Sequence, residues 1–452
     1  MRVAILGFGI EGKDALKYFV GKNTGIVVFD KKNREELSID EFLASQGETL
    51  QKIEWVLDEK YLDAGLNGFD LIVRSPGVRP DLPQMIEAVK KGAKLTSTTN
   101  IFFEECKTPI IAVTGTKGKG TTASLIAEAL KACGKKVCLL GNIGETMLSA
   151  LDTTSDVDFV VLELSSFQTI DLHKSPHIAV VTNITSDHMD WHISQEEYEK
   201  AKEQLWKHQV LADFLVMNWH DETSKKLAMN SNGVVVWYSS TYSPETYMYM
   251  KENEIWSKDL LIGKKDELII LGNHNLENAL AALVVARLIK VDIEKAWKGM
   301  AQFKGLEHRL EFVANVNGVT YINDSYATNP EPTIAAIRSF KEKKILILGG
   351  SSKNADFTML AREIAQSNTY AVILIGDEAE RIEKSLDENG YNKIVLRISG
   401  KPTMQDIIKP AYEMARREEV VILSPACASF GLFQNYKDRG EQFKDAVLML
   451  KS

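Results

Sequence analysis

Residues 110–122, IIAVTGTKGKGTT, decide the fold of the central part of this chain. A run of apolar and β-branched residues, typical of a buried strand, ends in a glycine-rich turn, and a helical pattern follows at once. Gly115, Gly118 and Gly120 let backbone N–H groups point inward, toward the positive end of the next helix. We therefore predict a phosphate site. The alternative, a glycine turn with an incidental lysine, leaves the order of strand, loop, lysine, hydroxyl and helix unexplained.

The polar side chains of this loop have separate tasks. Lys119 supplies a point charge for phosphate, and Thr121 supplies a hydroxyl for Mg²⁺. The loop is shorter than the standard GxxxxGK(S/T) motif, and Gly120 separates the lysine from the hydroxyl. The segment is thus a variant of the P-loop rather than a copy of it.

The composition excludes several classes of protein. The chain has 452 residues, is 44% hydrophobic and 26% charged, and carries a formal net charge of −8. This size suits about three domains of an ordinary soluble enzyme, and the absence of a long basic run argues against a nucleic-acid partner. No stretch approaches the roughly 18 apolar residues of a membrane helix, and the N-terminus lacks a secretory signal, so we predict a cytoplasmic protein without a membrane contact. Few cysteines and no CxxC pair predict reduced thiols: Cys106, Cys133, Cys138 and Cys427.

Apolar, strand-like runs alternate with helical patterns along the chain. This rhythm predicts an α/β protein with parallel sheets, whose ligands gather at the carboxyl ends of the strands. Composition shifts suggest three domains, at 1–98, 99–304 and 305–452, and shorter strand-like pieces in 213–271 predict an antiparallel extension of the central sheet. The runs are RVAIL (2–6), GIVVFD (25–30), DLIVRS (70–75), IIAVT (110–114), KVCLLG (136–141), DFVVLEL (158–164), HIAVVTNI (177–184), KILILGG (344–350), YAVILIG (370–376) and EVVILS (419–424).

The N-terminal strand leads into a second glycine-rich loop, GFGIEG. Gly7, Gly9 and Gly12 stand in GxGxxG register, and the next strand ends at Asp30, the spacing of a dinucleotide fingerprint. A nicotinamide and another nucleotide-shaped ligand both fit, because the glycines fix only a tight turn and a close approach of the backbone to phosphate. SPGV, residues 75–78, is expected to form a second loop at the same sheet edge.

Two segments after central strands carry possible metal ligands. Glu163 closes the strand FVVLEL and could hold Mg²⁺ on a nucleotide, although a strand-end acid that faces water is the alternative. His188 follows a further strand, beside Asp187 and Asp190. A lone histidine is usually structural, but this is the third such loop with a potential donor, which favours a metal site.

Other polar groups are less distinctive. Nothing in the spacing separates Lys202 from other lysines on its predicted helix. Asn275 and Asn278 fall on one helix face, where amides could read a nucleobase edge, but spacing alone favours helix capping. Loops at 308–311, 321–330, 348–357 and 423–440 concentrate glycines, hydroxyls and charges after strands, where a second substrate would be held.

Taken together, GTKGKGTT, ELSSFQ, NITSDHMDWH, GNHNLENALAA, HRLE, NDSYATN and SPACASF resemble the Mur ligases of cell-wall precursor synthesis, in order and over essentially the whole chain. The resemblance implies a three-domain protein: an N-terminal Rossmann-like domain that binds UDP, a P-loop-type ATPase domain and a C-terminal Rossmann-like domain. It also implies an ATP-dependent ligase that joins D-glutamate to UDP-N-acetylmuramoyl-L-alanine through an acyl phosphate, with two Mg²⁺ ions, for peptidoglycan. Short loops and the well-divided three-domain layout predict a monomer.

The resemblance also implies roles for individual residues. Lys119, His188 and Lys202, the last carbamylated, would be catalytic, and Thr121, Glu163, His188 and carbamylated Lys202 would hold the metal ions. ATP would contact Gly115, Thr116, Lys117, Gly118, Lys119, Gly120, Thr121, Thr122, Asn275, Asn278, Arg309 and Asp324. The UDP substrate would contact Gly9, Ile10, Asp30, Lys31, Ser75, Gly77, Asn142 and Ser165, and the amino acid Thr328, Lys353, Ser429 and Tyr436.

Three positions depart from the family pattern. Tyr326 stands where lysine is usual, Gly431 where aspartate is common, and Gly120 where serine or threonine is usual. Tyr326 removes a cation near the nucleotide, and the three changes lie near the ATP and amino-acid sites, so a related ligase for another amino acid, such as L-glutamate, is an alternative. A folate-type ligase lacks the N-terminal domain. A nicotinamide-dependent oxidoreductase built on GFGIEG leaves GTKGKGTT unexplained, and a non-catalytic nucleotide-binding module does not account for the several catalytic-type residues.

Overall fold

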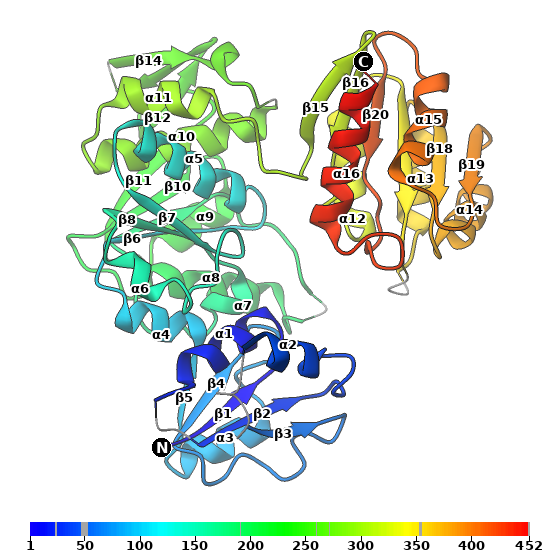
Figure 1. The fold of residues 1–452 in the computed structure, drawn as a ribbon. Coiled ribbons are helices and arrows are strands. Elements are labelled where there is room, and N and C mark those ends of the chain that lie inside the picture. The colour runs from blue at the N-terminus through cyan, green and yellow to red at the C-terminus, as the bar shows by residue number, and fades with distance from the viewer. Residues whose placement is uncertain are drawn as a thin grey trace. The chain divides into compact units, whose positions relative to one another are not determined.

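A computed structural model describes residues 1–22, 25–46, 53–189, 191–258, 260–270, 272–351 and 355–450. The chain divides into two compact units, Met1–Phe303 and Lys304–Ser452. Within the described residues, three sheets are each flanked by helices (Figure 1). No helix in this part of the chain has the length and apolarity needed to cross a membrane.

The first sheet of unit 1 is wholly parallel, in the order β3-β2-β1-β4-β5. The strand order reverses beside β1, so the loops after β1 and β4 lie at the topological switch point, the position at which doubly wound folds bind ligands. The strands are β1 (Arg2–Leu6), β2 (Gly25–Asp30), β3 (Glu54–Leu57), β4 (Leu71–Arg74) and β5 (Lys94–Ser97), and the helices are α1 (Ile10–Phe19), α2 (Ile39–Gln46), α3 (Pro83–Lys90) and α4 (Thr98–Glu105).

The second sheet of unit 1 has the order β14-β13-β12-β11-β10-β9-β6-β8-β7 among the described residues. β6 lies between β8 and β9, with all three strands parallel, so the loops that follow them meet at one edge. The strands are β6 (Ile110–Thr114), β7 (Val137–Gly141), β8 (Phe159–Glu163), β9 (Ile178–Val181), β10 (Phe214–Asn218), β11 (Val234–Ser239), β12 (Thr246–Lys251), β13 (Glu254–Ser257) and β14 (Leu260–Lys264). The helices are α5 (Lys119–Ala132), α6 (Leu151–Thr154), α7 (Ser166–Thr169), α8 (Gln195–Lys207), α9 (Glu222–Ala228), the 3₁₀ turn η2 (Lys265–Glu267), α10 (Asn273–Leu288) and α11 (Ile293–Ala301).

The predicted antiparallel extension is smaller than expected. β10, β11 and β12 continue the parallel sheet, and antiparallel pairing begins only between β12 and β13 and continues to β14. The connections explain part of this: α9 provides the crossover between parallel β10 and β11, and short turns join antiparallel β12, β13 and β14. β11 and β12 pair parallel although only residues 240–245 join them.

Unit 2 contains the third sheet, in the order β15-β16-β20-β17-β18-β19, where only β15 pairs antiparallel. Apolar residues of α15 and α16 fill one face, and those of α12, α13 and α14 fill the other. The strands are β15 (Glu311–Val316), β16 (Val319–Asn323), β17 (Lys344–Gly349), β18 (Thr369–Ile375), β19 (Ile394–Ile398) and β20 (Val420–Leu423), and the helices are α12 (Pro330–Ser339), α13 (Thr358–Gln366), α14 (Ala379–Glu388), α15 (Met404–Met414) and α16 (Tyr436–Met449).

The predicted α/β class, with mostly parallel sheets and a small antiparallel part, is confirmed. Strands β3, β5, β15, β16 and β19 were not among the predicted runs, because each is an edge or near-edge strand with few consecutive apolar residues. The domain boundaries at 98/99 and 304/305 stay predictions.

Gly12 fixes the approach of α1 to the loop after β1. A Cβ atom there would overlap the carbonyl oxygen of Gly7, whereas a Cβ on Gly9 would meet no atom within 4 Å. We expect Gly12→Ala to destabilise unit 1 by about 1–3 kcal/mol, because backbone must shift to admit the methyl group. Gly9→Ala is the matched control, and thermal unfolding of both variants is the measurement. Equal midpoints for the two would contradict this account of the packing.

Candidate active site

The loop between β6 and α5 requires glycine at two positions. Gly115 has a φ of +144° and Gly118 a φ of +86°, a range that favours glycine. A Cβ on Gly115 would overlap the Thr182 hydroxyl, and one on Gly118 would overlap the Asn278 side chain. The loop is therefore packed closely between the end of β9 and helix α10.

Asn183, which sequence reasoning missed, holds this loop in shape. Its carbonyl accepts from Thr116 N at 2.7 Å, and its Oδ1 accepts from Lys117 N at 3.0 Å. Its Nδ2 donates to the Lys117 carbonyl at 2.9 Å. These three bonds fasten the phosphate loop to the neighbouring strand end. The only sequence signal was a polar residue directly after a buried strand.

Lys119 is the first residue of α5, as the sequence predicts for a phosphate-binding lysine. Its Nζ donates to the Thr116 carbonyl at 3.0 Å, so the side chain folds back over the loop. Thr121 is half-buried in the same first turn. A positive charge and a helix N-terminus therefore meet at this loop, which is the chemistry that binds a polyphosphate.

The paired asparagines of α10 contact the P-loop helix. Asn278 Oδ1 accepts from the Thr122 hydroxyl at 3.1 Å, and Asn278 Nδ2 donates to Asn275 Oδ1 at 3.2 Å. The helix-capping interpretation is wrong, because α10 begins at Asn273 with Gly272 as its N-cap and without a side-chain cap. The Asn278 side chain instead lies against the phosphate loop at Gly118, and Asn275 accepts a hydrogen bond from it.

Glu163 ends β8, the strand next to β6. The residue is only 5% exposed, so the alternative interpretation, an acid that faces water, is wrong. Its backbone carbonyl accepts from Asn142 N at 3.1 Å, which joins the loop after β7 to the same edge. A buried carboxylate in this position can supply oxygen ligands to a hard cation.

Lys202 is the residue that the structure distinguishes and the sequence did not. It is 1% exposed, and its Nζ donates to the Gly115 carbonyl at 2.7 Å. One turn earlier on α8, the Tyr198 hydroxyl lies 3.0 Å from Thr116 Oγ1. Burial, and then the charge of Lys119, lower the pKa of Lys202 well below its ordinary value.

Acidic groups partly offset this shift. Asp187 and Glu163 both raise the pKa of Lys202, so the structure brings these carboxylates within electrostatic range of the amine. His188 adopts a left-handed backbone with φ of +55°, and its Nε2 lies 3.7 Å from Asp187 Oδ2. Its ring packs on Phe167 with centroids 4.8 Å apart. Asp190, the other acid of this loop, lies outside the described residues.

Most of the predicted UDP residues lie in loops at the carboxyl ends of strands of the first sheet, whereas Asn142 and Ser165 follow β7 and β8 of the second sheet. Gly9 and Ile10 follow β1, and Ile10 is 76% exposed at the start of α1. Asp30, at the end of β2, accepts from Phe8 N at 2.6 Å and from Lys32 N at 2.9 Å. Its carboxylate thus braces the glycine-rich loop.

The loop after β4 lies beside the loop after β1. The Ser75 hydroxyl donates to the Gly7 carbonyl at 2.8 Å, which ties the two loops together. Gly77 and Lys31 are exposed, and so is Asn142 after β7.

Glu11, a residue of α1 that sequence reasoning missed, connects the first sheet region to the second. Its carboxyl accepts from the Thr98 hydroxyl and from Gln168 Nε2, the latter at 2.6 Å. Gln168 in turn accepts from the Ser165 hydroxyl at 3.0 Å. Burial raises the pKa of Glu11. The segment ELSSFQ therefore serves as a polar junction between the two sheets of unit 1.

In unit 2, Asp324 lies at the carboxyl end of β16 and is 3% exposed. Its Oδ2 accepts from the Ser424 hydroxyl at 2.6 Å and its Oδ1 from Leu310 N at 3.1 Å. Burial raises the pKa of Asp324 to about 7, although these bonds and the charge of Arg309 oppose the rise. Arg309 itself is exposed.

The predicted amino-acid residues lie in loops after neighbouring strands. Thr328 follows β16 and is half-buried, whereas Ser429 follows β20 and is 4% exposed. Tyr436 begins α16. The ring of Tyr326 packs edge-on against the Tyr436 ring, with the two ring centroids 5.2 Å apart. Lys353 lies outside the described residues.

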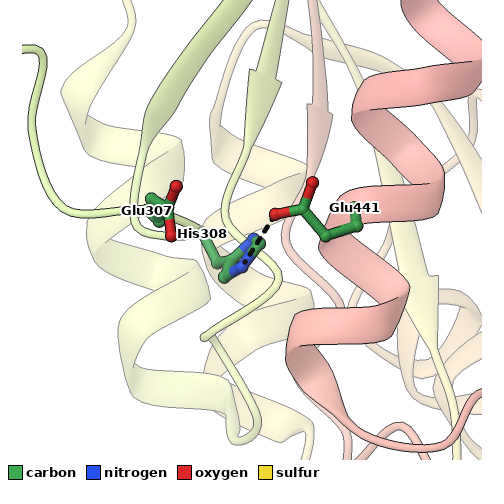
Figure 2. A group of neighbouring side chains, drawn as sticks. All are labelled: Glu307, His308 and Glu441. Carbon is green, nitrogen blue, oxygen red and sulfur yellow. Dashed lines mark ion pairs between the residues drawn. The ribbon is translucent and has the colours of Figure 1, made fainter. Parts of the chain in front are cut away.

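A histidine and two acids in unit 2 resemble a metal site in arrangement. Glu307, His308 and Glu441 approach one another from the start of unit 2 and from α16 (Figure 2). However, Lys444 Nζ lies 2.8 Å from Glu441 Oε1 and 3.9 Å from Glu307 Oε1, so an ammonium already supplies the positive charge. His308 Nδ1 also lies 3.0 Å from Asn323 Nδ2. This cluster is an ion-pair network that fixes the loop before Arg309.

Three α/β sheets, of which the central one carries a P-loop beside a buried acid and a buried lysine, define a nucleotide-binding enzyme. Three family models match the chain. They are the MurD-like N-terminal domain of Mur ligases at residues 1–97, the Mur ligase middle domain at 113–286 and the glutamate ligase domain of Mur ligases at 308–427.

Curated relatives match over the whole length. The chain is 39% identical to the UDP-N-acetylmuramoylalanine–D-glutamate ligase of Acetivibrio thermocellus, across 99% of this chain and 96% of the relative. It is 34% identical to the enzyme of the same name from Clostridioides difficile, across 100% and 99%. This chain therefore belongs to the Mur ligase family.

Solved structures share the fold. The MurC ligase of Thermotoga maritima aligns with a TM-score of 0.59 at 18% identity, and covers 99% of both chains. A MurF ligase of the same organism, solved in complex with ADP, aligns with a TM-score of 0.54 at 17% identity, across 94% of this chain and 95% of that one. These similarities extend the three-sheet fold to ligases with low sequence identity.

The buried carboxyl of Asp324 makes a pH-dependent contribution to stability. Because its pKa in the folded chain is about 7, above the ordinary 3.8, folding favours the protonated form; the contribution is complete below about pH 4 and is lost as the pH rises through 7. Asp324→Asn does not titrate. We expect the variant to gain stability relative to the natural chain between pH 5 and pH 8, by about 3 kcal/mol. If the asparagine amide forms weaker hydrogen bonds than the aspartate carboxyl, the resulting loss of stability does not change with pH.

Thermal unfolding at several pH values measures this difference. Asp387→Asn, at an exposed position of α14, is the control. A constant difference between Asp324→Asn and the natural chain would contradict the assignment.

Proposed function

We propose that this chain is an ATP-dependent ligase that joins D-glutamate to UDP-N-acetylmuramoyl-L-alanine in peptidoglycan precursor synthesis. Relatives that are 34–39% identical over the whole chain bear the name of this activity. The observation that carries the proposal is the P-loop: Lys119 folded over a glycine-constrained loop, next to the buried Glu163 and Lys202. An oxidoreductase built on GFGIEG has no use for this assembly, and membership of the Mur ligases argues against it.

The reaction has two chemical steps. A carboxylate is a poor electrophile and must first be activated. An oxygen of the terminal carboxylate of UDP-N-acetylmuramoyl-L-alanine attacks the γ-phosphorus of ATP; ADP leaves, and an acyl phosphate forms. The amine of the amino acid then attacks the acyl carbon, and inorganic phosphate departs with the bonding electrons as the amide forms. Lys119 and the backbone N–H groups of the P-loop stabilise the phosphoryl charge in the first step. Water must be excluded because an acyl phosphate hydrolyses readily.

The acidic edge of the central sheet suits magnesium. Mg²⁺ prefers oxygen ligands, and the buried Glu163 and the hydroxyl of Thr121 provide them beside the phosphate loop. Lys202 fits only after its amine has become a carbamate, which carries a negative charge. We propose that two ions are held by Thr121, Glu163, His188 and carbamylated Lys202; when bound, they would offset the repulsion between the substrate carboxylate and the triphosphate.

We propose that loops of the other two sheets bind the UDP group and the amino acid. The loops with Gly9, Ile10 and Ser75 would hold the UDP group. Asp30 would support the glycine-rich loop through its hydrogen bond from Phe8 N rather than contact the ligand. Thr328, Ser429 and Tyr436 would hold the amino acid. Tyr326 beside Tyr436 offers a ring where a lysine is usual, so L-glutamate or another amino acid is the alternative that the assay must exclude. We further propose that the enzyme is a cytoplasmic monomer.

Phosphate release tests the proposed activity. With UDP-N-acetylmuramoyl-L-alanine and ATP, we expect release to depend on D-glutamate and to be weak with other D- and L-amino acids. Lys119→Ala should lower the rate by about 10²–10³-fold, because a charge on the transferring phosphoryl group is lost. Lys131→Ala, which alters an exposed lysine at the other end of α5, is the control. Release that needs no amino acid would refute the ligase hypothesis.

The burial of Lys202 makes its amine reactive toward carbon dioxide. Only a neutral amine attacks CO₂, and the lowered pKa of Lys202 increases the neutral fraction near neutral pH. After equilibration with ¹³C-bicarbonate, we expect one carbamate carbon signal by NMR, which Lys202→Arg should abolish. Lys200→Arg, an exposed position on the same helix, should retain the signal. If the natural chain gave no carbamate signal above neutral pH, the proposed carbamylation of Lys202 would be wrong.

A further inference from the structure

Arg439 is an unusual residue of unit 2, because it is charged and completely buried. It lies in the first turns of α16 and is 0% exposed. Its Nε donates to the Ser325 hydroxyl and its Nη2 to the Ser325 carbonyl, both at 2.9 Å. Nη1 and Nη2 both donate to the Cys427 carbonyl at 3.2 Å. All four of these bonds end on uncharged oxygens.

The two acceptors belong to two different loops. Ser325 follows β16, directly after Asp324, and Cys427 follows β20, two residues before Ser429. β16 and β20 are parallel neighbours, with Asn323 paired to Leu423, so their loops emerge side by side. The guanidinium therefore spans the gap between a loop with predicted nucleotide contacts and a loop with a predicted amino-acid contact.

The second loop needs such a support. Ala426, next to Cys427, has a φ of +58°, a strained conformation for a residue with a Cβ atom. The Ser325 hydroxyl also donates to the Tyr436 carbonyl at 2.8 Å, so the start of α16 is held in the same network. A strained backbone persists only when its surroundings fix it, and here the surroundings include Arg439.

Stability alone does not explain an arginine at this position. A buried charge costs free energy, and a well-packed apolar residue would serve stability as well or better. Burial lowers the pKa of Arg439 to about 10, while the charges of Cys427 and Asp324 oppose this. Conversely, Arg309 and Arg439 are the two cations that favour the ionised form of Asp324. The guanidinium thus acts on the geometry of both loops and on the charge of one of them.

We propose that Arg439 is a positioning residue for ligation: its guanidinium clamps the Ser325 and Cys427 loops together and so holds Asp324, Thr328 and Ser429 in one arrangement. The residue does not touch substrate. The inference rests on the proposed function, because it takes the amino acid as the ligand of these loops.

Two substitutions separate the clamp from the charge. Arg439→Lys keeps the charge but cannot form the fork of parallel bonds. Arg439→Met keeps much of the length and removes the charge. We expect both to raise the KM for the amino acid about 10-fold or more, with the KM for the UDP substrate unchanged, because its predicted contacts lie in unit 1. Only Arg439→Met should also shift the acidic limb of the pH–rate profile to higher pH, since Asp324 loses a neighbouring cation.

A milder variant and a control protect the test against misfolding. Ser325→Ala removes one of the acceptors and leaves the bonds to both carbonyls, so it should raise the same KM by a smaller factor. Arg338→Met removes an exposed arginine of α12 that pairs with Glu363, and should leave both KM values unchanged. The proposal would be overturned if Arg439→Lys and Ser325→Ala left the KM for the amino acid unchanged. It would also be overturned if these variants raised the KM for the amino acid and the KM for the UDP substrate equally and lowered the melting temperature.

Hydrogen exchange gives a readout that does not depend on activity. We expect Arg439→Lys to accelerate exchange at 324–328 and 424–429 but not in the strands of the same sheet. If the natural chain shows no amino-acid-dependent phosphate release, the proposed function fails while this measurement still judges the clamp. Unchanged exchange in both loops would overturn it.

Discussion

The whole arrangement depends on the close contact between the turn after β6 and the end of β9. At Gly115 the backbone passes so near Thr182 that no Cβ atom fits, and Asn183 fastens the turn with three hydrogen bonds. This contact orients the start of α5, and with it Lys119. It also sets where Lys202 can reach, because the amine donates to the Gly115 carbonyl.

Buried charges recur where polar loops meet. Lys202 and Glu163 lie near the P-loop, Glu11 joins the two sheets of unit 1, and Asp324 and Arg439 lie together in unit 2. Each costs desolvation free energy, and Lys202, Glu11, Asp324 and Arg439 are held by hydrogen bonds to backbone, hydroxyl or amide groups. Such groups contribute less to stability than apolar residues of the same volume, and burial shifts the pKa of Lys202, Glu11 and Asp324 toward the neutral form.

Much of the fold followed from periodicity. Continuous apolar runs predicted the central parallel strands, because strands buried on both faces have no polar side. Edge strands such as β19 escaped: its apolar run, residues 394–396, is short and is interrupted by Arg397, so it leaves a weak signal. For the site, the glycines around Lys119 predicted the phosphate loop directly, and a strand-end acid predicted Glu163. Asn183, Glu11 and Arg439 escaped because their partners are distant in sequence: Arg439 binds Ser325, 114 residues away.

The sequence by itself determined the class of fold, the phosphate loop and, through its motifs, the resemblance to Mur ligases. These are local properties, in which the spacing of a few residues dictates backbone conformation. The tertiary structure decided which lysine of α8 is buried, which amide braces the P-loop and which carboxyls have raised pKa values. Burial and electrostatic environment are set by residues far apart along the chain, so no local pattern contains them.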